Sequence, residues 1–287
     1  MSSLWGLGHI SAHRTAVEEI RGSAPGRFAI LINFQIEKSE KLVEEGSLKI
    51  KEFLERHGFE ILIVTKRPMS EVAYVFNNTM RKATEFNRRN PTMDSFVFVH
   101  YIGLGTIYPH SDFPLRPYVY LLNEWCYKAM EQFLGIDQIF TLTDPNFYDY
   151  RFSGKRPIVS VVLDIYLSGD ESYFRNVERD ISPFLDKTRD SIKDNGLKTT
   201  HSFFVGYTTD KESYTEKFIN VVQDHIARIP DLELDKDISA ASDTPIKTTS
   251  LARSIINRFF ELKRKVHFER VMNNSDADGY RFLSQFQ

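Results

Sequence analysis

The sequence predicts an α/β fold in which a mainly parallel sheet carries helices on both of its faces. Short, near-continuous apolar runs recur along the chain, beginning with residues 28–34. Runs of this kind are typical of strands that are buried on both faces. They alternate with stretches of roughly 10 to 20 residues whose apolar positions have helical spacing, and this alternation indicates a parallel sheet. The sequence contains no internal repeat of fixed period.

The apolar runs place five strands. They are expected at residues 28–34, 59–64, 96–102, 157–165 and 202–207. Residues 1–26 lack sustained periodicity and end in a cluster of Gly, Ser and Pro, so we expect a short leader there.

Helices are expected between the strands. The first ends at Gly58, which suits a helix C-cap, and the second begins at Ser70, which suits an N-cap. Their expected core residues are Leu48, Ile50, Phe53 and Leu54 in the first helix and Val72, Val75, Met80 and Ala83 in the second. Three further helices are expected over residues 118–134, 212–229 and 250–266.

The composition excludes several classes of function. The formal net charge of the 287 residues is −2, which gives no support for binding to nucleic acid or to a membrane surface. The basic run 258–270 is interrupted by acidic residues and is read as a solvated helix face. No stretch approaches the roughly 18 to 20 apolar residues of a membrane span. The single cysteine, Cys126, excludes disulfides within the chain and Cys-based zinc sites. We expect a cytoplasmic protein without cofactor or metal.

Several local motifs occur in an order that resembles the caspase family. Gly58-Phe59-Glu60-Ile61 is similar to the Gly-Phe-x-Val of the family's second strand, and Asp94-Ser95-Phe96-Val97 to the opening of its third. Arg156-Pro157-Ile158-Val159 is similar to the Lys-Pro opening of the fourth strand, and Tyr207-Thr208-Thr209, followed by Phe218-Ile219, to the Tyr-Ser-Thr region of the small subunit. The resemblance spans about residues 27–229.

This resemblance implies a caspase-like, three-layer αβα fold with a sheet of about six strands. It also implies a division of the chain after the leader. Residues 27–169 correspond to the large subunit, 170–199 to the linker between subunits, and 200–287 to the small subunit. The linker region contains five aspartates and is read as a charged connector in preference to a cleavage site.

The resemblance also shows which catalytic groups are missing. A cysteine protease needs a thiolate nucleophile and a histidine near it. Counted without gaps from the matching motifs, the family's histidine position falls at Gly103 and its cysteine position at Ile165. Neither residue can transfer a proton or attack a carbonyl. We therefore expect a protein that is not an enzyme.

Four residues are candidates to replace the missing pair. His100 lies three residues before Gly103, so in a pleated strand it should face the other side of the sheet as a hydrogen-bonded core residue. His110 would have no thiol to activate. Cys126 is expected in the middle of a helix as inert packing, and Ser168 has no suitable base and is read as a turn residue.

Substrate recognition is also reduced. Caspases bind an aspartate side chain with arginines, whose planar guanidinium pairs with both carboxylate oxygens. At the first of these positions the chain offers Lys38 and Lys41 but no arginine, and residues 210–214 lack the Trp and Arg of the second.

The leading hypothesis is a non-catalytic caspase homologue that binds active caspases or their adaptors and regulates, by preference inhibits, their activation in apoptosis or a related pathway. Heterodimers would form through the edge of the small-subunit-like part of the sheet. The alternative is a doubly wound enzyme, a hydrolase or nucleotide-binding protein, for which Asp164 or Gly103-Leu104-Gly105 could serve. An isolated Asp is more often a hydrogen-bonding residue. A purely structural interaction domain is a third possibility.

Overall fold

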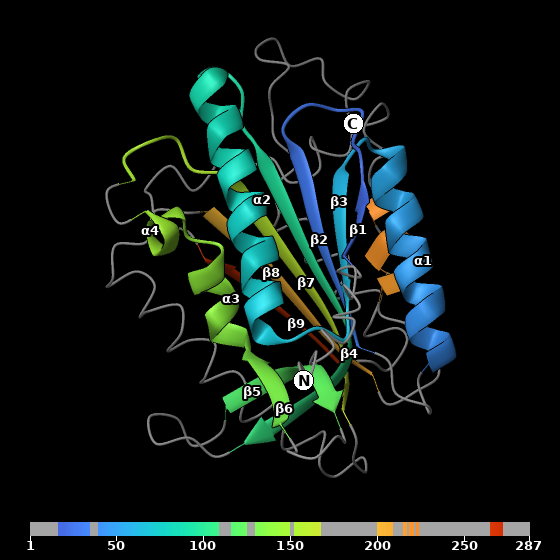
Figure 1. Ribbon diagram of the computed structural model, residues 1–287. Helices are drawn as coiled ribbons and strands as arrows, with labels where there is room; N and C mark the ends of the chain where they lie inside the picture. The colour runs from blue at the N-terminus through green and yellow to red at the C-terminus, as the bar shows by residue number, and fades with distance from the viewer. Residues whose placement is uncertain are drawn as a thin grey trace, which may run out of the picture.

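The computed structural model describes residues 17–34, 40–108, 116–124, 130–149, 152–167, 200–208, 215–216, 218–220, 222–223 and 265–271. In chain order its elements are β1 (Val17–Ile20), β2 (Arg27–Phe34), α1 (Glu40–Arg56), β3 (Glu60–Thr65), α2 (Met69–Arg89), β4 (Phe96–Tyr108), β5 (Arg116–Glu124), β6 (Met130–Gly135), α3 (Ile136–Leu142), α4 (Pro145–Tyr148), β7 (Ile158–Leu167), β8 (Thr200–Thr208) and β9 (Lys265–Val271). Figure 1 shows the helices packed around a single twisted sheet.

The sheet has a parallel centre and antiparallel margins. Its strand order is β1-β3-β2-β4-β7-β8-β9, and β5 and β6 form a hairpin that branches from β4. The five strands from β3 to β8 in this order run parallel, whereas β1 and β9 pair antiparallel at the two ends. The five parallel strands are those predicted from the apolar runs. The predicted α/β fold, with a mainly parallel sheet and helices on both faces, is confirmed.

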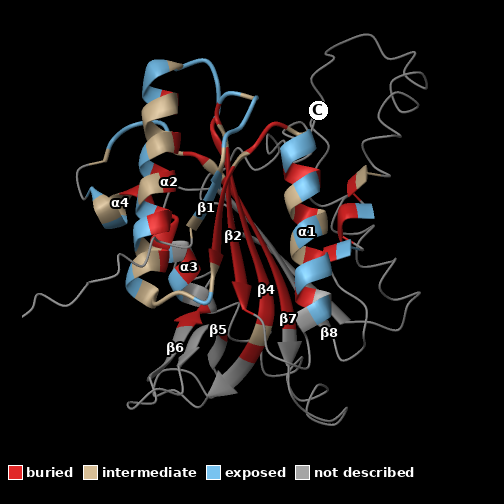
Figure 2. Cartoon of the chain, turned by 45° about the vertical axis from the view of Figure 1, so that its right-hand side comes forward, coloured by how far each residue is buried: buried red, intermediate tan, exposed pale blue. Residues whose placement is uncertain are grey.

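Two apolar clusters sandwich the sheet, as Figure 2 shows by the red strands between the helices. One face is covered by α2 and α3, and the other by α1 together with the helical residues among 215–223. We call these the α2 face and the α1 face. In β2, Ile30 and Ile32 pack on the α2 face, while Ala29 and Leu31 pack on the α1 face. Alternating side chains therefore fill both cores, as expected for a strand that is apolar throughout.

Helix α1 ends where its sequence predicts. Gly58 has φ of 74°, which favours glycine. The Phe59 N–H donates to the Leu54 carbonyl and the Gly58 N–H to the Glu55 carbonyl, as in a Schellman motif. The C-cap prediction at Gly58 is thus confirmed. Leu48, which was expected in the core, is instead 54% exposed, because the buried stripe of α1 runs through its neighbours at helical spacing.

Helix α2 begins at a different residue from the predicted one. Its N-cap is Pro68, whose carbonyl accepts hydrogen bonds from the Glu71 and Val72 N–H groups. Ser70 lies within the helix and is exposed. Proline has φ preset near −65° and lacks an N–H group, so it fits this helix entry without a side-chain cap. The predicted core residues of α2, Val72, Val75, Met80 and Ala83, are all buried.

The segment expected as a leader contains an edge strand. β1 pairs with β3, and lysines from the two flanking helices reach it from opposite faces. Lys51 of α1 binds Glu18 at 2.7 Å, and Lys82 of α2 binds Glu19 at 3.1 Å. A four-residue strand with two polar positions has too short a pattern to be recognised from sequence.

The helix predicted over residues 118–134 is wrong. Residues 116–124 and 130–135 form β5 and β6, which pair antiparallel. β4 continues to Tyr108, past its predicted end at 102, and pairs with β5 from Gly105 opposite Val119 onward. The apolar run 118–122 fits a strand as well as a helix, and pairing with β4 decides between them. Cys126 lies outside the described residues.

The last part of the sheet joins the two predicted subunit-like regions. β7 pairs with β8 from Ile158 opposite Thr200 to Tyr166 opposite Thr208. β8 also pairs with β9, which is the edge strand at this end of the described sheet. Lys265 and Val266, expected at the end of a helix, belong to β9. The rest of that helix and the 170–199 linker lie outside the described residues.

Candidate functional site

The carboxyl ends of β4 and β7 bring together the two positions singled out by sequence. The strands are parallel neighbours, and Gly103 lies directly opposite Ile165 in their register. Carboxyl ends of parallel strands are the usual place for a site in such sheets. The expectation that the third and fourth predicted strands lie side by side is therefore confirmed.

Gly103 has no room for a side chain. A Cβ atom built on it would lie 2.6 Å from the Phe34 carbonyl oxygen and 2.8 Å from the Tyr101 hydroxyl. The φ angle of 157° is also one that residues with a side chain rarely adopt. Tyr101 is fixed in this place because its hydroxyl donates to the Leu104 carbonyl at 2.6 Å. A histidine at position 103 would require β2 and β4 to separate.

Ile165 lies in an apolar core and not in an open cleft. It is 1% exposed and belongs to the cluster on the α2 face. Phe34, Val119 and Leu134 are members of the same cluster, each at most 1% exposed. Val119 and Leu134 come from the β5–β6 hairpin, which Figure 1 shows at the carboxyl ends of the strands. Ile165 is thus buried within an apolar cluster that includes residues of the β5–β6 hairpin.

A hydrogen-bonded network of three polar residues lies across the sheet, on the α1 face. His100 Nε2 is 2.9 Å from the Thr215 hydroxyl, which donates to Asp164 Oδ2 at 2.9 Å. The Thr215 N–H donates to the same carboxylate oxygen at 3.0 Å. All three residues have zero exposure. The network joins β4 and β7 to Thr215, which is helical.

The network fixes the tautomer of His100. The hydroxyl of Thr215 has one proton, which goes to Asp164 because an ionised carboxylate can only accept. His100 Nε2 must therefore carry a proton and donate it to Thr215. The Nδ1 atom is then an acceptor, and no described residue forms a hydrogen bond with it. Burial lowers the pKa of His100 to about 3, so the imidazole is neutral at physiological pH.

This arrangement suits stability and not nucleophilic attack. In a catalytic triad the histidine lies between the hydroxyl and the carboxylate and removes the hydroxyl proton. Here the hydroxyl of Thr215 lies in the middle, and its proton is directed to Asp164. The same carboxylate oxygen also accepts the backbone N–H of Thr215. The network therefore anchors Thr215 to the sheet.

The structure also places several of the residues considered as replacements for the missing histidine and cysteine. His100 bonds to Thr215 on the α1 face, opposite the Gly103 side, so its predicted role as a hydrogen-bonded core residue is confirmed. Asp164 likewise is a hydrogen-bonding residue. Gly103 and Gly105 lie within β4, not in a loop between strand and helix, so they form no phosphate-binding turn. Lys41 is exposed beside Glu45 at 3.8 Å. Lys38, His110 and Ser168 lie outside the described residues.

Two other kinds of feature are absent from the described residues. No group of three or more His, Cys, Asp or Glu side chains there could hold a metal ion. No helix within the same ranges has both the length and the hydropathy needed to cross a bilayer.

Comparison with known proteins gives a likeness to solved structures and no match by sequence. No protein-family model matches the sequence, and no curated protein matches it. Among solved structures, the Drosophila initiator caspase Dronc is similar to this chain, with a TM-score of 0.48 and 9% sequence identity. The superposition covers 89% of this chain and 84% of that one.

The role of Thr215 was not anticipated from the sequence. It lies 51 residues from Asp164 and 115 from His100, and long-range pairs of this kind leave no local pattern. The one available signal was a hydroxyl residue three positions before Phe218, at the start of an apolar helical run. Such residues are favoured at helix entries.

The pH dependence of stability should report the buried imidazole of His100. Its pKa in the folded chain is about 3, below the 6.5 of an exposed histidine, so the unfolded chain binds the proton more tightly. The contribution of the neutral His100 to the free energy of unfolding is fully present above pH 6.5. It is lost as the pH falls toward 3, at about 1.4 kcal/mol per pH unit. We expect a loss of about 2 kcal/mol between pH 6.5 and pH 5 from this group.

Urea unfolding across this pH range measures the effect. His100→Gln keeps an N–H donor for Thr215 but does not titrate, so its stability should fall less steeply below pH 6.5. His57→Gln, at a partly exposed histidine, is the matched control and should keep the wild-type slope. Equal slopes for His100→Gln and wild type would contradict the assignment.

Proposed function

We propose that this chain is a caspase homologue without peptidase activity, which binds an active caspase or a caspase adaptor and restrains its activation. The observation that carries the proposal is the pairing of Gly103 with Ile165 at the carboxyl ends of β4 and β7. At the positions where the sequence resemblance expects an imidazole and a thiol, the chain has a glycine without space for a side chain and a buried isoleucine.

The residues around these positions support a binding function over a change of catalytic group. A thiolate nucleophile needs a polar and partly open environment that lowers its pKa. Ile165 instead belongs to a buried apolar cluster. The histidine that is present in β4, His100, donates to Thr215 on the other face. The polar side chains of His100, Asp164 and Thr215 thus stabilise the fold.

The arrangement of the last strands supports a particular mode of binding. β9 is a seven-residue edge strand, held on its inner side by β8. An edge strand presents unpaired backbone N–H and C=O groups, to which a strand of another protein can add. We propose that the partner pairs with β9.

The experiment combines the purified chain with an active caspase of the same organism. We expect the two to elute together in size-exclusion chromatography and the cleavage of an aspartyl peptide to slow as the chain is added. The chain alone should cleave nothing. Failure to bind any caspase or adaptor of that organism, or cleavage by the chain itself, would overturn the proposal.

A matched pair of substitutions tests the binding mode. His267→Pro removes a backbone N–H from β9, and Glu19→Pro removes one from β1 at the opposite edge. Prolines are tolerated best in edge strands, and circular dichroism checks that each variant is folded. We expect His267→Pro to weaken the complex and Glu19→Pro to leave it intact. The reverse result would assign the partner to the β1 end.

A further inference from the structure

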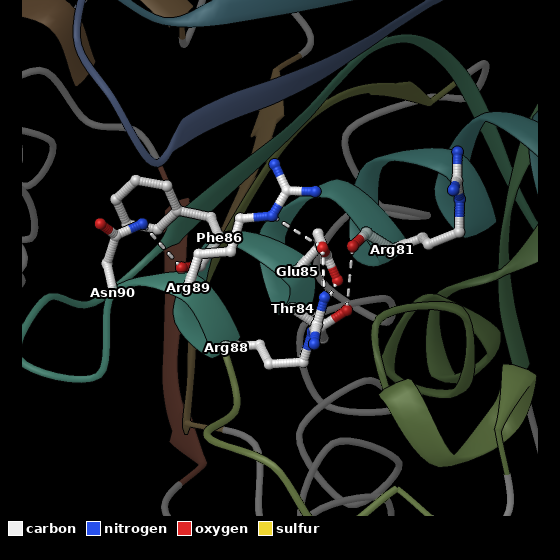
Figure 3. A network of polar contacts seen from close by, with 7 residues as sticks. All are labelled: Arg81, Thr84, Glu85, Phe86, Arg88, Arg89 and Asn90. Atoms are coloured by element: carbon white, nitrogen blue, oxygen red, sulfur yellow. Dashed lines mark hydrogen bonds and ion pairs between the residues drawn. The ribbon is translucent and has the colours of Figure 1, made fainter.

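The exposed side of the last turns of α2 carries three arginines and one glutamate. Arg81, Arg88 and Arg89 form what we call the arginine cluster. Glu85 lies between Arg88 and Arg89, and the Arg81 side chain extends to one side of them (Figure 3). The side chains of Arg88 and Arg89 are 73% and 72% exposed, and that of Glu85 is 36% exposed. Three guanidinium groups against one carboxylate leave two positive charges on this surface.

Glu85 holds two of the arginines in defined positions. Arg88 donates through Nε to Oε2 at 2.9 Å and through Nη2 to Oε1 at 2.6 Å. Arg89 donates through Nε to Oε1 at 2.8 Å. Among the described residues, neither Nη group of Arg89 has a hydrogen-bond partner. The donors that remain are therefore fixed in place, so binding an oxyanion costs little further side-chain entropy.

The charge of the cluster is stable over the physiological pH range. Hydrogen bonding from Arg88 lowers the pKa of Glu85 to about 2, and the same contact raises the pKa of Arg88. Lys82, the neighbouring cation, is engaged elsewhere by Glu19 and Glu60 on the strands. The arginine cluster is thus a separate positive surface, distinct from the ion pairs that Lys82 forms with the strands.

The helix dipole explains only part of this arrangement. Cations in the last turn interact favourably with a helix C-terminus, which accounts for Arg88 and Arg89. Arg81 lies two turns earlier, beyond the reach of that effect. Among the described residues its Nη2 has one long contact, of 3.4 Å, with Asn78 Oδ1, so its guanidinium is available to a ligand.

We propose that the arginine cluster is a docking surface for an acidic peptide segment of a partner protein, with Arg89 binding one carboxylate and Arg81 a second. A guanidinium pairs with a carboxylate through two parallel hydrogen bonds. Nucleic acid is the poorer fit, because its binding draws on many phosphate contacts and the chain has a net charge of −2. This surface lies on α2 and is independent of β9.

Fluorescence anisotropy with a labelled peptide of eight alternating Asp and Glu residues tests the proposal on the full chain. We expect binding at low salt that weakens with added NaCl and is unchanged between pH 5.5 and 8. Arg89→Gln should reduce the affinity about tenfold, as expected for loss of a charge-assisted hydrogen bond. Arg56→Gln, an exposed arginine in the last turn of α1, makes the same change in net charge and should alter the affinity less than about twofold.

Three results would overturn the inference. The first is absence of peptide binding at low salt, and the second is an equal loss of affinity in Arg89→Gln and Arg56→Gln. The third is tighter binding of a single-stranded oligonucleotide of equal charge, which would assign the surface to nucleic acid. No caspase takes part in this assay, so its outcome is separate from that of the proposed function.

Discussion

Asp164→Ala is expected to lower the free energy of unfolding by about 3 to 5 kcal/mol. The substitution removes the carboxylate oxygen that accepts both the N–H and the hydroxyl of Thr215. Both donors would then be buried without a partner, and each such loss costs about 1 to 3 kcal/mol. Domains are typically stable by about 5 to 15 kcal/mol, so the variant should unfold at a much lower urea concentration.

The matched control for this variant is Asp94→Ala. Asp94 also forms a charged contact, with Lys155 at 2.9 Å, but its side chain is 46% exposed. Exposed ion pairs contribute at most about 1 kcal/mol. A loss below about 1 kcal/mol for Asp164→Ala, equal to that of the control, would show that the network does not anchor the helical residues at 215.

Gly103→Ala is expected to cost about 2 to 5 kcal/mol, although it adds a single methyl group. The new carbon would lie 2.6 Å from a backbone oxygen of Phe34. A backbone atom of a central strand cannot move aside as a flexible side chain can. The φ angle at this position adds further strain.

Gly154→Ala provides the comparison, because residue 154 is exposed and the nearest atom, Phe152 Cζ, is 3.0 Å away on a side chain that can move. We expect a change within about 0.5 kcal/mol there. Thermal unfolding of both variants measures the difference. If Gly103→Ala were as stable as the wild type, position 103 could accept a side chain and the main support for the proposed function would be lost.

The parallel part of the fold could be predicted because its strands are apolar on both faces. Residues 28–34 read as a buried strand in isolation, and so do the runs that became β3, β4, β7 and β8. The antiparallel strands β1, β5, β6 and β9 could not be predicted in the same way. β5 has an apolar run, 118–122, that fits a helix too, and only the pairing of Val119 with Gly105 decides its conformation.

The same distinction holds for the candidate site. The positions of Gly103 and Ile165 follow from counting along two strands, and the pleat alone predicts that His100 faces away from them. The partner of His100 does not follow. Thr215 reaches both His100 and Asp164 only after the chain has returned to the α1 face, and no local pattern encodes that return.

The ion pairs that Lys51 and Lys82 form with the glutamates of β1 have a consequence for how copies of such a domain could associate. Short edge strands with charged side chains resist the addition of further strands, and β1 has four residues, two of them glutamates bound to lysines. A strand from another copy is therefore expected to add at β9 and not at β1. Molecules that can pair through one sheet edge each form a closed dimer. Molecules that could pair through both edges would form an open filament.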